Sequence, residues 1–386
     1  MNNKICDLCT GCGACLCACP QKCITMIENK ISERIPKIDN KKCVNCGVCK
    51  RVCPQNNSPQ MNLPQKCYVA WSNREKDLVF SASGGIAVSI ARYQLLSNNR
   101  VYGCDYTNSV DLDFFSIENE NDLIKLQSSK YSQSKAYHVF SQIKNELKSK
   151  AVVFIGTPCQ VAGLKNYLKK PYSNLILIDL VCHGTPPNTY LKEYINEIGV
   201  SLPVDKIRFR GEYNQRLTIW KNDRIIYNKP YEDDLYFSAF YKNKISMNAC
   251  YTCKYAQEKR VSDITIADFW GLGELKKINK KSERPSLVLI NTNQGEQFFN
   301  NVLPYICFEE RTVQEAISGN GRLNNPPGKS LEAKAFQLFY KKFGFSKAVH
   351  LSSRVKVSQD KINEKRIGIQ KQRKRFKKSL KRRLHI

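Results

Sequence analysis

The chain has 386 residues, enough for two or three domains, and its 42% hydrophobic content excludes a globally disordered protein. The formal net charge is +28, a figure that counts eighteen cysteines as neutral. Cysteine thiolates around iron clusters would lower that charge by a few units and leave the chain strongly basic.

The N-terminal residues 1–4 lead straight to Cys6 with no apolar signal segment. Nothing in the sequence approaches about eighteen consecutive apolar residues, the length that a membrane span needs. We therefore expect a cytoplasmic protein. In that compartment thiols stay reduced, so dense cysteine indicates metal binding rather than disulfides.

Two cysteine motifs dominate residues 1–62, which carry no long periodic segment. Both have the spacing C-x₂-C-x₂-C-x₃-C-P of bacterial two-cluster ferredoxins, in which the fourth cysteine of each motif binds the other cluster. We predict an α+β ferredoxin-like module with two [4Fe–4S] clusters. Their ligands are Cys9, Cys12, Cys15 and Cys53 at one cluster, and Cys43, Cys46, Cys49 and Cys19 at the other.

Zinc is the alternative occupant, because it also binds four cysteines at this spacing. Two complete copies of the motif, each ending in Cys-Pro, favour iron–sulfur clusters. Cys6, Cys17 and Cys23 lie nearby, but the eight ligands are complete without them, so we interpret them as packed thiols. Cys67, Cys104 and Cys307 have no partner pattern and are interpreted as buried thiols.

After a linker the pattern becomes α/β, with residues 65–150 and 151–320 as two parts of one domain. Continuous apolar runs at 152–155 and 175–178 are typical of buried parallel strands. Thr312 and Glu315 have capping-box spacing. The predicted helices are 86–96, 134–148, 159–168 and 188–198, and the predicted strands are 100–105, 151–156, 174–182, 207–210, 218–227 and 286–291.

A second cysteine set falls within this domain. Cys159 follows a predicted strand at the start of a helix, where the helix N-terminus favours a thiolate. Cys182 ends the next strand, so both should lie at the carboxyl edge of a parallel sheet. Cys250 and Cys253 add a C-x₂-C pair. A third [4Fe–4S] cluster, zinc and unconnected or dithiol cysteines are the alternatives that the residues leave open.

Five segments in this order resemble the coenzyme F-420 hydrogenase/dehydrogenase beta-subunit family. They are SGG at 83–85, KYSQS at 130–134, GTPCQVAGL at 156–164, IDLVCHG at 178–184 and CYTC…ITIADFWG at 250–271. The resemblance covers residues 65–310. It implies an α/β flavin- and cluster-binding domain that holds FAD, and relatives often carry an N-terminal two-cluster ferredoxin domain.

The resemblance also implies roles for individual residues. It favours a third cluster on Cys159, Cys182, Cys250 and Cys253. It places Ser83, Gly84, Gly85, Lys130, Ser132, Gln133, Ser134 and Thr157 at the flavin. His183 is the candidate catalytic residue, since it could supply a proton beside the flavin; a histidine that only bonds the local backbone is the alternative.

Residues 330–386 are predicted to form a basic helical tail. Fourteen Lys and Arg side chains against Asp360 and Glu364 lie between Arg354 and Ile386. Ile369, Phe376, Leu380 and Leu384 fall at helical spacing and give the tail an apolar stripe. Such a helix can lie on an anionic membrane surface at the inner face, and a solvated tail is the alternative. Nucleic acid is the less favoured partner.

The leading hypothesis is a flavin-dependent iron–sulfur oxidoreductase. Electrons from a ferredoxin or a reduced deazaflavin would pass through the clusters and FAD to an organic substrate. Bacterial relatives suggest a role in surface-polysaccharide synthesis. The alternatives are a non-catalytic electron-transfer subunit of a larger redox complex and a basic zinc protein that binds nucleic acid.

Overall fold

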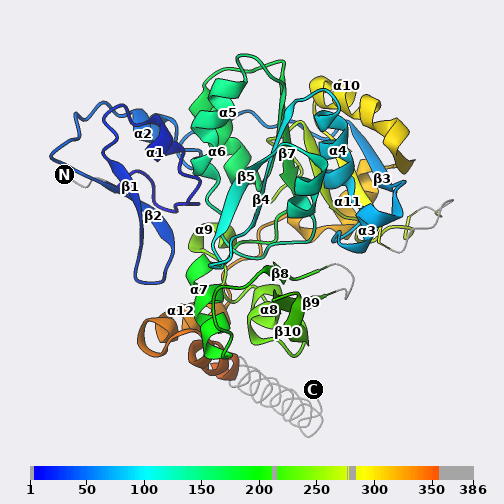
Figure 1. The fold of residues 1–386 in the computed structure, drawn as a ribbon. Helices are drawn as coiled ribbons and strands as arrows, with labels where there is room; N and C mark the ends of the chain where they lie inside the picture. The colour runs from blue at the N-terminus through cyan, green and yellow to red at the C-terminus, as the bar shows by residue number, and fades with distance from the viewer. Residues whose placement is uncertain (1–3, 211–214, 276, 278–283, 356–386) are drawn as a thin grey trace, which may run out of the picture.

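The computed structural model describes residues 4–210, 215–275, 277 and 284–355 (Figure 1). They form an N-terminal module, a large mixed sheet covered by helices, and a smaller sheet with its own helices. Together these parts follow the predicted order of an α+β module before an α/β domain.

The N-terminal module is built from two similar halves around one antiparallel hairpin. Its elements are α1 (Ala14–Ala18), β1 (Ile24–Glu28), β2 (Arg34–Ile38) and α2 (Val48–Arg51). Each short helix begins after a glycine with positive φ, 72° at Gly13 and 71° at Gly47. A left-handed residue turns the chain sharply there, so each cysteine loop folds back before its helix starts.

The large sheet has eight strands in the order β13-β3-β12-β11-β7-β6-β4-β5. Strands β4, β6, β7 and β11 pair in parallel, while the remaining neighbours pair antiparallel. All five residues of β6 are buried, as its continuous apolar run predicted. The strands are β3 (Lys66–Ser72), β4 (Arg100–Tyr106), β5 (Leu112–Ile117), β6 (Val152–Gly156), β7 (Leu175–Leu180), β11 (Ile264–Asp268), β12 (Ser286–Ile290) and β13 (Ile306–Arg311).

Helices cover both faces of this sheet. Val152 and Phe154 of β6 share a core with α5 (Phe140–Glu146), α6 (Pro158–Leu168) and the N-terminal module. Val153 and Ile155 point the other way, as alternation requires, toward α4 (Ile86–Leu95) and α10 (Asn293–Val302). In Figure 1 α5 and α6 stand between the module and the sheet. The module is therefore packed against the α/β domain through α6.

The helix predicted over 134–148 is shorter than expected. A 3₁₀ turn, η2 (Ala136–His138), precedes α5. Lys135 is held in place before this turn because its N–H donates to the carbonyl of Leu112 at the start of β5. Pairing with the sheet edge thus overrides the helical apolar spacing of this segment.

A second, three-stranded sheet contains β8 (Lys206–Arg208), β9 (Arg216–Lys221) and β10 (Arg224–Pro230). The single strand predicted over 218–227 is wrong, because Asn222 and Asp223 have positive φ and form a hairpin turn. This sheet shares a core with α7 (Asn188–Glu197), α8 (Leu235–Tyr241) and α12 (Leu331–Phe343).

Several short elements and the region near the C-terminus complete the described chain. Thr312 caps α11 (Val313–Gly319) by accepting from the N–H of Glu315, as its spacing predicted. In α12, Phe336 and Tyr340 are buried beside Tyr190 of α7. The start of the predicted tail is therefore part of the packed body. The predicted apolar stripe at 369–384 lies outside the described residues. The remaining elements are α3 (Glu75–Val79), η1 (Glu120–Leu126), α9 (Asn248–Tyr251), η3 (Leu303–Tyr305) and η4 (Gly321–Leu323).

Candidate redox centres and cofactor cavity

The structure gathers the eight motif cysteines of the N-terminal module into the two predicted groups. The first cavity is lined by Cys9, Cys12, Cys15 and Cys53, and the second by Cys19, Cys43, Cys46 and Cys49. The fourth cysteine of each motif thus lies with the first three of the other motif. The N–H of Gly11 donates to Cys9 Sγ at 3.3 Å, the kind of amide–sulfur bond that tunes a cluster.

The four cysteines of the second set also come together. Cys159 lies in the first turn of α6, Cys182 follows β7, Cys250 is in α9 and Cys253 follows it. The other three cysteines lie close enough to Cys159 to raise the pKa of its thiol electrostatically. Amides again face sulfur: the N–H of Gly184 donates to Cys182 Sγ at 3.4 Å, and that of Thr185 to Cys250 Sγ at 3.5 Å.

The protonation of these thiols depends on whether a cation is bound. Burial, together with the neighbouring cysteines, raises the pKa of Cys182 to about 12 and that of Cys250 to about 11. Burial also raises the pKa of Cys12 in the first cavity to about 11. Without metal the thiols stay protonated, whereas iron binds the thiolate form and releases the protons.

In the described part of the chain, no three or more His, Cys, Asp or Glu side chains converge as ligands of one ion would. In a cubane each cysteine binds a different iron, so its four sulfurs stand apart around the cluster. Cysteine-only donors are the set that iron–sulfur clusters use. The three groups therefore fit [4Fe–4S] clusters by donor chemistry.

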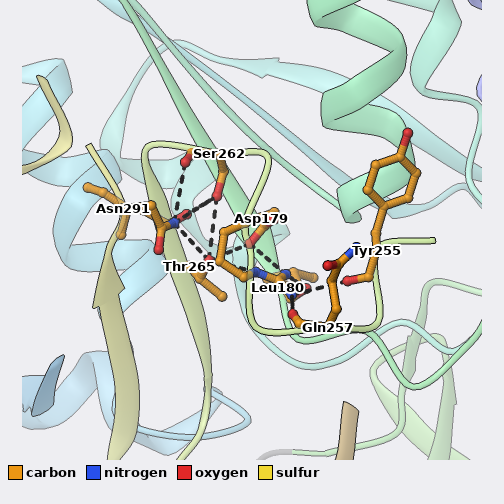
Figure 2. A network of polar contacts seen from close by, with 9 residues as sticks. Asp179, Leu180, Tyr255, Gln257, Ser262, Thr265 and Asn291 are labelled. Atoms are coloured by element: carbon orange, nitrogen blue, oxygen red, sulfur yellow. Dashed lines mark hydrogen bonds and ion pairs between the residues drawn. The ribbon is translucent and has the colours of Figure 1, made fainter. Parts of the chain in front are cut away.

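A buried polar network fixes two of the segments that carry the second set (Figure 2). Arg260, which is 1% exposed, donates to the carbonyls of Tyr255 and Gln257 at 3.2 and 3.3 Å. It also donates to the carbonyl of Leu180 at 3.2 Å and pairs with Asp179 at 2.9 Å. The guanidinium thereby ties the loop after Cys253 to the strand end before Cys182.

Asp179 and the strands around it complete this network. Its carboxylate accepts from Thr265 Oγ1 at 2.6 Å, and Thr265 accepts from the side chain of Asn291 at 3.0 Å. Asp179 is 0% exposed, and the guanidinium of Arg260 and the hydroxyl of Thr265 compensate its buried charge. Asp179 lies in a segment that carries the family resemblance, but the sequence did not predict its ion pair with Arg260, which lies in a distant segment of the chain.

The second cysteine set lies against the first cavity. A Cβ built on Gly163 of α6 would lie 3.0 Å from Cys12 Sγ, tighter than ordinary van der Waals contact, so the glycine lets the helix lie close to that cysteine. Tyr255, in the loop after Cys253, donates its hydroxyl to the carbonyl of Pro54 at 3.1 Å. Segments that carry ligands of the two centres are thus in direct contact.

We expect Gly163→Ala to disturb the first cavity. Glycine-to-alanine changes inside helices usually stabilise by about 0.5–1 kcal/mol. Here the new methyl group would press on Cys12, so we expect a loss of about 1 kcal/mol or more instead. Electron paramagnetic resonance (EPR) of the reduced protein should show an altered signal for the first cluster.

Gly321→Ala is the matched control, because nothing lies within 4 Å of a Cβ at Gly321. An unaltered cluster signal together with a stabilised Gly163→Ala protein would show that α6 does not press on Cys12.

A cavity of about 250 Å³ lies beside the second cysteine set, and Cys182 of that set lines it. This cofactor cavity is close to the lower end of the range of ligand pockets, roughly 300–1,000 Å³. The residues at 86–88, in the first turn of α4, line it, and no side chain caps that helix. The first amides of such a helix can receive an anion, although the N–H of Val88 already donates to the carbonyl of Gly85 at 3.1 Å. The predicted residues that line the cavity are Ser83, Gly85, Lys130, Ser132, Ser134, Thr157, Cys182 and His183.

Two predicted flavin residues do not line this cavity. Gly84 packs its α-carbon against β3, where a Cβ would lie 2.4 Å from the carbonyl oxygen of Ala70. Gln133 is buried and donates from Nε2 to the carbonyl of Thr10 at 3.2 Å. Gln133 thus joins the α/β domain to the N-terminal module. Both contacts are between distant segments, which the local motifs could not reveal.

Internal hydrogen bonds hold several of the lining side chains. Lys130 Nζ donates to the carbonyls of Lys125 and Gln127 at 2.6 and 2.8 Å. Burial lowers the pKa of Lys130, although Asp105 opposes that effect. Ser132 donates to Asn188 at 2.6 Å. Lys130 therefore shapes the wall of the cavity more than it offers a free charge.

Sequence reasoning missed part of the lining. Arg210 forms an ion pair with Asp268, and Ser286 bonds Ser83 across the cavity wall at 2.8 Å. Burial lowers the pKa of His183, and the guanidinium of Arg322 lowers it further. Asp268 lies in the segment 250–271 that carries the family resemblance, so the sequence pointed to it as a candidate site residue. Nothing in the sequence around Arg210 marked that residue as part of a site.

Comparisons with known proteins agree with this arrangement. Residues 8–57 match the family model of the 4Fe-4S dicluster domain. Residues 149–316 match the model for the C terminus of the coenzyme F420 hydrogenase/dehydrogenase beta subunit. The coenzyme F420-dependent sulfite reductase of Methanocaldococcus jannaschii is 28% identical over 199 residues. That match covers 50% of this chain and 31% of the relative, so the chain spans about a third of its length.

Among solved structures, a chain of the F420-reducing [NiFe] hydrogenase complex from Methanosarcina barkeri aligns with 68% of this chain. The alignment covers 92% of that chain, with 15% sequence identity and a TM-score of 0.46.

The dicluster module and the cysteine-lined α/β domain define an iron–sulfur protein of an oxidoreductase family. Residues 149–316 match the C-terminal model of the coenzyme F420 hydrogenase/dehydrogenase beta subunit, the family that the sequence resembles, and they follow a 4Fe-4S dicluster domain in the same chain. Among the described residues, no helix has the length and apolar character of a membrane span.

Proposed function

We propose that this chain is an iron–sulfur flavoprotein oxidoreductase. Electrons would travel from the N-terminal module through a third [4Fe–4S] cluster to FAD in the cofactor cavity, and from there to an organic substrate. When bound, FAD would convert single-electron delivery into two-electron chemistry. The resemblance makes a sugar or lipid-linked compound the first substrate class to test.

One observation carries this proposal: Cys182 lines the cofactor cavity and also belongs to the second cysteine set. The cavity therefore has a potential cluster ligand in its wall. The contact of Gly163 with Cys12 extends this series to the first cavity. Cys15 in the first cavity also feels the charge of Cys49 in the second. These proximities support an electron path through the three cysteine groups.

This chain's residues supply the features that FAD binding needs. The uncapped N-terminus of α4 can hold a phosphate group through its backbone amides. Ile86, Ile155 and Ile266 give the cavity apolar walls for a ring system. Ser83, Ser134 and Thr157 offer polar groups around these walls.

The test is purification without oxygen, followed by assays of iron, sulfide and flavin. We expect three clusters, about four irons each, and bound FAD. Only the iron of two clusters, or no flavin after gentle purification, would overturn the proposal.

Electrons would arrive at the second cavity, whose cysteine loop is open to solvent. Cys46 and Val44 are exposed there. Exposed Lys41, Lys42 and Lys50 flank the loop, and the nearby Asp39 is its one acidic neighbour in that stretch. The charges around this cavity favour an acidic donor protein.

We expect the double change Lys41→Glu/Lys42→Glu to slow reduction by an acidic ferredoxin, mainly by raising its KM. Electrostatic steering accelerates association by about 10–10³-fold at low salt, and reversal of two charges would remove most of this acceleration. Stopped-flow reduction at several salt concentrations measures the effect.

Lys334→Glu/Lys341→Glu is the matched control, because it places the same charge change on two exposed lysines of α12. This variant should be reduced at the wild-type rate. Equal rates for both double variants would rule out docking at the second cavity.

We propose that His183, which lines the cofactor cavity, moves a proton there. Its lowered pKa keeps the imidazole neutral, with one N–H to give and one lone pair to accept. We expect His183→Gln to lower kcat by about 10²-fold or more, the usual size of general acid–base effects. Iron and flavin contents should equal those of the wild type. Unchanged kcat would assign His183 a structural role.

The second candidate function is an electron-transfer subunit that docks to a separate catalytic protein. It is favoured by the relative from Methanocaldococcus jannaschii, of which this chain covers only 31%. Turnover of candidate substrates by the isolated, flavin-loaded chain would support the enzyme. Reduced flavin without turnover of any substrate until a partner is added would support the alternative.

A further inference from the structure

Each cavity of the N-terminal module is lined by five cysteines, one more than a cluster needs. Cys6 lines the first cavity and Cys23 lines the second. Sequence reasoning assigned these two thiols no role, because the eight ligands of the motifs are complete without them. Both pack in or against the hydrophobic core, as the interpretation of packed thiols requires, and both also line a cysteine cavity.

The extra thiol of the second cavity lies beside two of its ligands. Cys23 Sγ is 3.4 Å from Cys19 Sγ, and Cys43 lines the same cavity. Cys19 is the fourth cysteine of the first motif, and Cys43 is the first cysteine of the second motif. Cys23 is buried and therefore faces the cavity rather than solvent.

The extra thiol of the first cavity occupies the equivalent place. Cys6 lines this cavity together with Cys53 and Cys9. Cys53 is again the fourth cysteine of one motif, and Cys9 is the first cysteine of the other. By contrast, Cys17 lines neither cavity, and its thiol donates to the carbonyl of Tyr137 at 3.3 Å. Proximity in sequence alone therefore does not account for the positions of Cys6 and Cys23.

We propose that Cys6 and Cys23 are exchange ligands, each able to replace the fourth cysteine at its cluster. The exchange has no redox step: the incoming thiol loses its proton as sulfur binds iron, and the departing thiolate takes up a proton. The fourth cysteine comes from the opposite half of the module, so relative motion of the halves would strain that iron–sulfur bond first. A thiol within contact distance could then keep the fourth iron in place.

The inference rests on the clusters of the proposed function, and its test separates the two. In anaerobically reconstituted protein, we expect Cys19→Ala to keep the iron content and [4Fe–4S] EPR signal of the wild type. Cys19→Ala/Cys23→Ala should lose iron from the second cavity. Cys46→Ala is the matched control: Cys46 has no extra thiol beside it, so this variant should lose iron even with Cys23 present.

The first cavity gives an independent set, with Cys53→Ala, Cys53→Ala/Cys6→Ala and the control Cys12→Ala. Equal iron loss in Cys19→Ala and Cys46→Ala, or equal iron in Cys19→Ala and its double variant, would overturn the inference. A wild-type chain without clusters would instead overturn the proposed function.

The variants of the motif cysteines could fold poorly, so a second measurement uses variants that keep all eight motif cysteines and compares how fast they release iron. Cys23→Ala should release iron to a chelator several-fold faster than Cys17→Ala, because only Cys23 can rebind an iron that loses its fourth sulfur. Equal release rates would refute ligand exchange at the second cavity.

Discussion

Replacement of Cys253 by alanine is expected to remove one cluster and to disconnect the cofactor cavity from the N-terminal module. Cys253 belongs to the second cysteine set, where Cys159 feels its charge most strongly among the three neighbouring thiols. The variant should lose about four irons per chain, while the EPR signals of the dicluster module persist. Flavin reduction by a donor should fall to the background rate.

Cys307→Ala is the matched control for this change. Cys307 lies on β13 and lines none of the cysteine cavities, so removal of its thiol should leave iron content and flavin reduction unaltered. If Cys253→Ala retained the iron and flavin reduction of the wild type, the second cysteine set would not hold a cluster.

The second large effect is expected from Arg260→Met. The change leaves the carboxylate of Asp179 buried without its cation, which typically costs about 3–5 kcal/mol. It also frees the loop after Cys253 from the strand end before Cys182, so the third cluster should be lost more readily. Thermal unfolding and iron release, both measured without oxygen, report the two consequences.

A double variant and a surface variant sharpen this test. Asp179→Leu/Arg260→Met should recover much of the lost stability, because replacing both partners of a buried pair by apolar groups is often neutral. Arg224→Met removes an exposed arginine on β10 and should change stability little. If Arg260→Met were as stable as Arg224→Met, the buried pair would contribute nothing to the fold.

Local patterns predicted much of the fold. The apolar runs of β6 and β7 identified parallel strands correctly, since strands buried on both faces need continuous apolar residues. The spacing of Thr312 and Glu315 alone predicted a helix start. The turn at Asn222 and Asp223 was missed because its flanking residues continue the strand-like pattern on both sides.

Contacts between distant segments were beyond local patterns. The regular ferredoxin spacing predicted which cysteines of the module lie together. It could not predict that Gly163 of α6 lies against Cys12. Arg260 and Asp179 form an ion pair although they are far apart in the sequence. The residues around each of them do not predict this pairing. Gln133 was predicted at the flavin, although its amide instead reaches Thr10 in the module. Tertiary packing decides each of these positions.

The central claim is that electrons pass from the module through the second cysteine set to the cofactor cavity. Stopped-flow spectroscopy of the flavin-loaded protein, mixed with a reduced acidic ferredoxin without oxygen, tests it most directly. We predict bleaching of cluster absorbance first and flavin reduction second in the wild type, with the second phase missing in Cys253→Ala. Flavin reduction at the wild-type rate in Cys253→Ala would contradict the claim.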